Sequence, residues 1–201
     1  MSKGRGKCGG AASARGLVIE PVTAERWGDF ERLFGARGAC GGCWCMWWRL
    51  TAKEFEGRKG ASNTRAMKAL VRGGKVPGLL AYAGEEPVGW CAVAPRSTYP
   101  RLSRSRILRP VDDADVWSVV CFFVAKPWRS RAVATALLRA AVDFVRARGG
   151  KAVEGYPVEP AKSKIPDAFA YPGVASAFKA AGFVEVARRS PTRPIMRYLL
   201  E

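Results

Sequence analysis

No histidine occurs among the 201 residues of the chain. This absence excludes enzymes that depend on an imidazole, such as those with a Ser–His or Cys–His nucleophile pair and zinc enzymes with an HExxH motif. A catalytic base, if the chain has one, must be another group, and a carboxylate is the natural alternative.

Long hydrophobic runs are also missing. The longest, at 116–125, is too short to span a bilayer, and the first 16 residues lack the apolar segment of a signal peptide. The six cysteines are too few for a disulfide scaffold. We therefore expect a cytoplasmic protein with reduced thiols and no membrane partner.

Acidic residues are scarce. The chain has 17 Asp and Glu residues and 34 Lys and Arg residues, which gives a net charge of +17. The basic residues are spread along the chain, which favours a soluble domain with a basic surface over a dedicated nucleic-acid-binding protein. Attraction of an anionic cofactor or substrate is a further explanation. One basic cluster contains no intervening acid and has no assigned role: Arg96, Arg101, Arg104, Arg106 and Arg109.

What the chain does have is apolar side chains, with 48% hydrophobic and 10% aromatic residues. This is enough for a packed core, and the length suits one domain. Residues 1–16 are rich in glycine and basic residues, so we predict a flexible basic leader followed by a single domain at 17–201.

The hydrophobic pattern predicts a mixed α/β domain of the α+β type, with a mostly antiparallel sheet flanked by helices. Thr23 is the expected N-cap of the first helix. The predicted strands are 17–20, 79–83, 88–94, 116–125, 151–156, 183–188 and 195–200, and the predicted helices are 23–34, 62–72, 132–148 and 173–181.

The strand at 116–125, the turn at 126–131 and the helix that follows form the most informative unit. A turn of small residues that opens a helix exposes unpaired backbone N–H groups at the positive end of the helix dipole, which suits a phosphate or pyrophosphate. Arg129 and Arg131 add positive charge there.

The stretch from Val124 to Leu138 resembles the acetyl-CoA signature of the GNAT N-acyltransferase superfamily, Arg/Gln-x-x-Gly-x-Gly/Ala between a strand and an Ala/Leu-rich helix. The stretch from Ala175 to Phe183 is similar to the family's Ala-x-x-x-Tyr-x-x-x-Gly-Phe, and the order of elements agrees. The resemblance implies a GNAT-like fold whose β-bulged central strand leads into a CoA-binding turn. It also implies transfer of an acetyl group from acetyl-CoA, as co-substrate, directly to an amine of a small molecule, peptide or protein.

In that family the backbone amides after the fourth strand hold the pyrophosphate of CoA. Phe122 and Val124 would pair with the pantetheine arm as an added strand does. Ser130 and Ala132 stand where glycine is usual, so we expect the turn to form without positive φ at these positions. The implied cofactor residues are Phe122, Val124, Arg129, Ser130, Arg131, Ala132, Val133, Ala134 and Phe178.

Phe178 occupies the position of a tyrosine that in many relatives protonates the leaving thiolate. Phenylalanine has no proton to donate, so Tyr171, Ser176 or a water would take this role. Packing of a short helix is the alternative explanation of this segment.

Glu154 is the predicted base for the amine. It lies in the middle of a strand and shares a face with Tyr156, which we assign to the acceptor side. An ion pair with a nearby arginine is the alternative. Asp112, Asp113 and Asp115 would attract a cationic amine or belong to a solvated loop.

Residues 40–49 read Cys-Gly-Gly-Cys-Trp-Cys-Met-Trp-Trp-Arg. Three cysteines at this spacing, completed by Cys8, Cys91 or Cys121, are compatible with zinc or with redox chemistry. The chain has no second Cys-x-x-Cys and no histidine, so we predict no metal site. The resemblance favours a wall of the acceptor pocket, with a plain core cluster as the alternative. The residues concerned are Trp44, Met46, Trp47 and Trp48.

The leading hypothesis is thus an acetyl-CoA-dependent N-acetyltransferase whose partners are acetyl-CoA and an amine acceptor. One alternative is a GNAT-like protein of reduced catalysis that binds CoA as a sensor. Another is an acetyltransferase of an RNA-linked acceptor, for which the positive surface would guide the RNA. Nucleic acid is a possible but not the favoured partner, and the sequence leaves open whether the protein forms a homodimer.

Overall fold

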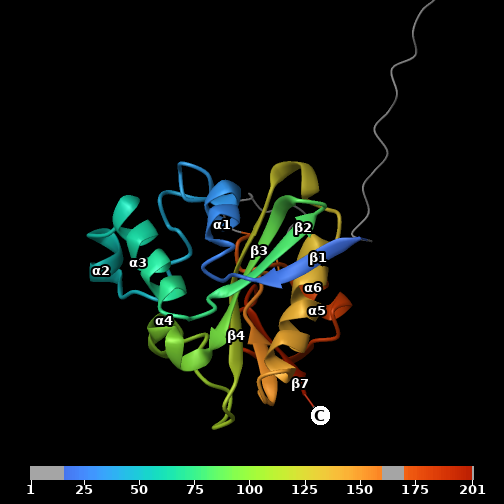
Figure 1. Cartoon of the computed structure of the whole chain (residues 1–201). Helices are drawn as coiled ribbons and strands as arrows, with labels where there is room; N and C mark the ends of the chain where they lie inside the picture. The colour runs from blue at the N-terminus through green and yellow to red at the C-terminus, as the bar shows by residue number, and fades with distance from the viewer. Residues whose placement is uncertain (1–15, 160–169, 201) are drawn as a thin grey trace, which may run out of the picture.

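The computed structural model describes residues 16–159 and 170–200, which form one seven-stranded sheet with helices on both faces (Figure 1). The strand order is β1-β2-β3-β4-β5-β7-β6, and neighbours are antiparallel except for the parallel pair β4 and β5. The predicted fold class is confirmed, whereas residues 1–15 of the predicted leader lie outside the described residues. The strands are β1 (Leu17–Pro21), β2 (Gly78–Ala83), β3 (Glu86–Pro95), β4 (Trp117–Val124), β5 (Ala152–Gly155), β6 (Val184–Arg188) and β7 (Pro194–Leu199).

The helices divide between the two faces of the sheet. Phe30 of α1, Met67 of α3 and Leu102 of α4 pack into one hydrophobic core, and Leu137 of α5 and Phe178 of α6 pack into the other. Figure 1 shows α2, α3 and α4 to the left of the sheet and α5 and α6 to the right. The helices are α1 (Trp27–Phe34), α2 (Ala52–Glu56), α3 (Ala61–Arg72), α4 (Pro100–Arg104), α5 (Val133–Arg146) and α6 (Ala175–Ala180). No helix within the described ranges is long and apolar enough to cross a membrane.

Three helical details differ from the prediction. Thr23 is not the N-cap of α1, because its carbonyl accepts the Arg26 N–H in a turn and the helix begins only at Trp27. The five-residue helices α2 and α4 were not predicted. α2 begins with a capping box between Thr51 and Glu54, a spacing that the sequence does show.

A β-bulge in the central strand separates β4 from β5. Ala92 of β3 pairs with Cys121 but Val93 pairs with Val119, so Val120 is the extra residue. The parallel pairing with β5 ends at Val119, and β4 then continues against β3 alone. The predicted bulge is therefore confirmed, and it frees one edge of the end of β4.

Candidate active site

A cavity of about 850 Å³ opens beside the freed end of β4. Its walls come from residues between 39 and 55, from the end of β4, from the turn and first residues of α5, and from residues between 170 and 177. No carboxylate occurs among the described residues that line it, and most of the wall is aromatic or aliphatic. The size and apolar walls suit a small organic ligand.

The turn from β4 into α5 contains two left-handed residues that are not glycine. Ser130 has a φ of 57° and Ala132, which caps α5, has a φ of 58°. The expectation that these positions avoid positive φ is therefore wrong. The path of the chain between β4 and α5 decides this conformation, at a strain of roughly 1 to 2 kcal/mol per residue.

The first turn of α5 supplies backbone donors to the cavity. The first intrahelical bond there runs from the Ala136 N–H to the Ala132 carbonyl, so the N–H groups of Val133, Ala134 and Thr135 have no partner within the helix. Ala132 provides no side-chain cap. All four residues from Ala132 to Thr135 line the cavity at the positive end of the helix dipole. This is the geometry on which the predicted anion site depends.

The other predicted cofactor residues divide into two groups. Phe122, Val124, Arg129 and Ser130 line the cavity. Arg131 does not, because its guanidinium lies over the Trp128 ring, 5.5 Å from the ring centroid.

Backbone groups on the freed edge of β4 already have partners. The Phe122 N–H donates to the Tyr171 carbonyl at 2.6 Å, and the Val124 carbonyl accepts Nε–H of Arg129 at 3.1 Å. The Ala125 N–H donates to the Val88 carbonyl at the start of β3. Because successive N–H groups of a strand point to opposite sides, the Val124 N–H points away from β3. A ligand that pairs with the Phe122 N–H must therefore displace the Tyr171 carbonyl.

Glu154 does not line the cavity. It is 1% exposed and pairs with Arg197 of β7, with oxygen–nitrogen distances of 2.6 and 2.9 Å. Nη1 of Arg96 lies 3.7 Å from its other oxygen. The geometry thus gives the predicted base no access to a substrate and matches the alternative, an ion pair with arginine.

Tyr156 belongs to the same buried network and not to the acceptor side of the cavity. Its hydroxyl donates to Glu154 at 3.1 Å and lies 2.8 Å from Oγ of Ser118. Burial, and secondly the charge of Glu154, raise the pKa of Tyr156, so its hydroxyl stays protonated. Asp112 completes the network through two hydrogen bonds from Arg197, which lower the pKa of the Asp112 carboxyl.

The aromatic segment serves both predicted roles, with different residues in each. Trp47 and Trp48 line the cavity. Trp44 and Met46 are buried in the core beneath α1, where the Trp44 ring stacks 5.8 Å from that of Phe34. Two of the four residues therefore line the cavity and two belong to the core, and their contact with an acceptor stays a prediction.

Cysteines form part of the cavity wall as well. Sγ of Cys45 accepts hydrogen bonds from the Cys121 thiol and from Trp90 Nε1–H, the second at 3.2 Å, and both bonds lower the pKa of Cys45. The bond between the two thiols raises the pKa of Cys121. Burial raises the pKa of Cys43 to about 11. Within the described part of the chain, no group of three or more His, Cys, Asp or Glu side chains is placed to hold a metal ion.

Of the proposed proton donors, only Tyr171 lines the cavity. Burial raises its pKa, which keeps the hydroxyl protonated. Ser176 is exposed on α6, and Phe178 is fully buried against Phe122 and Phe183. Phe178 therefore packs α6 onto the sheet and does not touch the cavity.

Sequence reasoning did not select Cys121, Phe123 or Trp128, which also line the cavity. The first two lie two positions apart on β4, so they share a face of the strand. That alternation was visible in the sequence, but nothing in it shows which face borders a cavity.

The family model of the acetyltransferase (GNAT) family matches residues 44–161, which is more than half of the chain. The chain belongs to the GNAT acetyltransferase family. The matched region contains the bulged strand, the left-handed turn and α5, the elements that build the cavity of this GNAT acetyltransferase. The predicted family and enzyme class are thereby confirmed.

Solved structures with the same fold include a GNAT-family acetyltransferase from Streptococcus pneumoniae, at 12% identity and a TM-score of 0.54. Another is the PaiA N-acetyltransferase of Thermoplasma acidophilum in complex with coenzyme A, at 12% identity and a TM-score of 0.50. In both comparisons the match covers 92% of this GNAT acetyltransferase and 99% of the other chain. No curated protein sequence matches the chain.

Proposed function

We propose that this GNAT acetyltransferase transfers the acetyl group of acetyl-CoA directly to an amine that binds in the cavity. The observation that carries the proposal is the start of α5, where N–H groups without helical partners open into the cavity beside the freed edge of β4. The PaiA N-acetyltransferase, which has the same fold, binds coenzyme A.

The residues present fit such a donor. The N–H groups of Val133, Ala134 and Thr135 would hold the pyrophosphate, and the cavity of about 850 Å³ accommodates a pantetheine arm along β4. When bound, acetyl-CoA supplies an activated thioester, so that an amine can take the acetyl group as the thiol leaves.

Tyr171 is the proposed acid in this reaction. Its raised pKa keeps a proton on the hydroxyl oxygen at neutral pH, available to a thiolate that forms in the cavity. The described lining residues include no carboxylate, so the amine proton would leave to water. The aromatic walls limit the number of waters near the reacting atoms.

The test is an assay of the purified protein with acetyl-CoA and a broad panel of amines, in which free thiol release is followed. Acetylation of at least one amine at rates well above the uncatalysed reaction is expected. Tight CoA binding without turnover across the panel would overturn the proposal and favour the alternative of a non-catalytic CoA sensor.

A further inference from the structure

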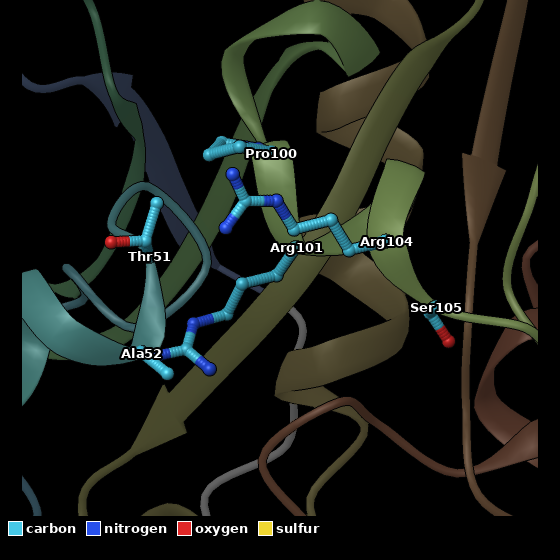
Figure 2. Close-up of a pocket in the computed structure, with 6 residues that line it drawn as sticks. All are labelled: Thr51, Ala52, Pro100, Arg101, Arg104 and Ser105. Carbon is cyan, nitrogen blue, oxygen red and sulfur yellow. The ribbon is translucent and has the colours of Figure 1, made fainter.

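A second pocket, of about 300 Å³, lies between the start of α2 and α4. Figure 2 shows Arg101 and Arg104 reaching from α4 toward Thr51 and Ala52. Pro100 and Ser105 complete the lining, so no carboxylate occurs among its described lining residues. Two arginine side chains therefore line a pocket that has no negative charge among its described lining residues.

Arg101 is held in place but has an unused donor. Its Nε–H donates to the Leu50 carbonyl at 2.9 Å, whereas Nη2 is buried and has no hydrogen-bond partner among the described residues. Burial lowers the pKa of Arg101, as expected for a cation removed from water without a bonded carboxylate. Buried donors without a partner are uncommon in folded proteins, and a missing ligand is one cause.

The guanidinium of Arg101 also adjoins the large cavity. It lies 3.7 Å from the centroid of the Trp47 ring and 5.9 Å from that of Phe55, and both rings line the cavity. Its charge also acts on Tyr171 and Cys43 of the cavity wall. The Trp47 ring therefore contacts Arg101 of the small pocket and also lines the large cavity.

Two carboxylates lie near the pocket without lining it, and the charge of one of them, Glu56, acts on Arg101. Glu54 feels the charge of Arg104, but its Oε2 accepts the backbone N–H and the hydroxyl of Thr51, each at 2.8 Å. Oγ of Ser105 accepts the Leu108 N–H at 3.2 Å, which leaves the hydroxyl proton free to donate. The pocket thus offers donors and positive charge, and among the described residues no carboxylate lines it.

We propose that the acceptor is an amine that also carries a carboxylate or phosphate group. That anion binds Arg101 and Arg104 while the amine lies in the large cavity beyond Trp47. The inference rests on the proposed acetyl transfer and specifies its substrate class. Guanidinium groups suit this role because their planar N–H groups match two oxygens of a carboxylate or phosphate.

The first test compares acceptors that differ only in the anion. 6-Aminohexanoate is paired with hexylamine, and 6-aminohexyl phosphate with 6-aminohexanol, because the amine and the anion must reach opposite sides of the Trp47 ring. We expect kcat/KM to be higher for an anionic member by about tenfold or more, the range of a charge-assisted hydrogen bond. Equal or faster turnover of the neutral members would overturn the inference and leave acetyl transfer itself intact.

The second test uses Arg104→Gln and Arg101→Gln, with Arg106→Gln as the matched control because Arg106 is exposed and lines neither pocket. Each of the first two should raise the KM of the anionic members about five- to tenfold relative to the KM of the neutral ones, and Arg106→Gln should leave this ratio unchanged. Arg104 is exposed, so its variant tests the inference even where Arg101→Gln disturbs folding. An unchanged preference in Arg104→Gln would contradict the proposal.

A third measurement does not depend on turnover. Calorimetric titration with 6-acetamidohexanoate and N-hexylacetamide, in the presence of CoA, compares the two products directly. Tighter binding of the carboxylate, weakened by Arg104→Gln, is expected. Equal affinity for the two would overturn the inference, whereas absence of turnover with every amine would overturn acetyl transfer.

Discussion

Ala132 adopts a left-handed conformation with φ of 58° and ψ of 16° at the residue that caps α5. A side chain there is costly because Cβ approaches the following carbonyl oxygen. Ser130 has the same problem two residues earlier. The strain lies where the backbone must turn its N–H groups toward the cavity, which is where strain is often retained for function.

Replacing Ala132 by glycine should relieve this strain. For Ala132→Gly we expect the free energy of unfolding to rise by about 0.5 to 1 kcal/mol, because the relief exceeds the extra entropy of glycine in the unfolded chain. Urea unfolding measures the change. Ala134→Gly is the control, since Ala134 lies in the helix and loses stability on the same substitution. A lower midpoint for Ala132→Gly would contradict the expectation.

Tyr171 combines two functions in one residue, since its carbonyl bonds to Phe122 and its ring lines the cavity. Tyr171→Phe keeps the carbonyl and removes only the proposed acid. We expect kcat to fall by about 100-fold, the contribution of a positioned acid. Because burial raises the pKa of Tyr171 above its ordinary value, the wild-type rate should not fall through loss of this proton at neutral or mildly alkaline pH. Ser176→Ala should not reproduce the loss, and an unchanged kcat in Tyr171→Phe would refute the role.

At the scale of elements, the buried ion pair joins β5 to β7. Glu154 and Arg197 stand opposite each other in the antiparallel register of these strands, and Arg197 reaches on to Asp112 in the loop before β4. Breaking a buried pair leaves one charge without a partner. The pair therefore ties three segments that are distant in the sequence.

Glu154→Gln separates a structural role from a catalytic one. We expect the free energy of unfolding to fall by about 3 kcal/mol, while kcat per folded molecule stays within about twofold of the wild type. A catalytic base would instead show a loss of about 100-fold or more with near-normal stability. Thermal unfolding and turnover, measured on the same preparation, distinguish the two, and Arg197→Met should match the destabilisation.

Some features of these elements could be predicted from the sequence and others could not. Period-two alternation placed Glu154 and Tyr156 on one face of their strand, and the structure confirms this through their hydrogen bond. The alternation contains no information on the partner strand, so it could not show that Arg197, 43 residues further along the chain, stands opposite Glu154. The long strands and helices were found because their apolar periodicity is extended, whereas α2 and α4 are too short to show one.

At the scale of the whole molecule, the sheet separates two cores, and the cavity lies where the bulge of β4 interrupts the sheet between them. The resemblance to the GNAT signature predicted this arrangement because the motif includes the strand, the turn and the helix together. The cavity wall outside this motif was less predictable. It comes from residues around 40–55 and 170–174, whose paths depend on contacts and not on periodicity.

The hydrogen bond between the Phe122 N–H and the Tyr171 carbonyl has a kinetic consequence. A donor molecule can use that N–H only after Tyr171 has moved, and the same residue forms part of the wall against which the acceptor lies. The first substrate to arrive thus completes the binding surface for the second. We expect a compulsory order with acetyl-CoA leading, visible in initial-rate patterns as CoA inhibition that is competitive toward acetyl-CoA and not toward the amine. A single backbone hydrogen bond would then determine the order in which the two substrates bind.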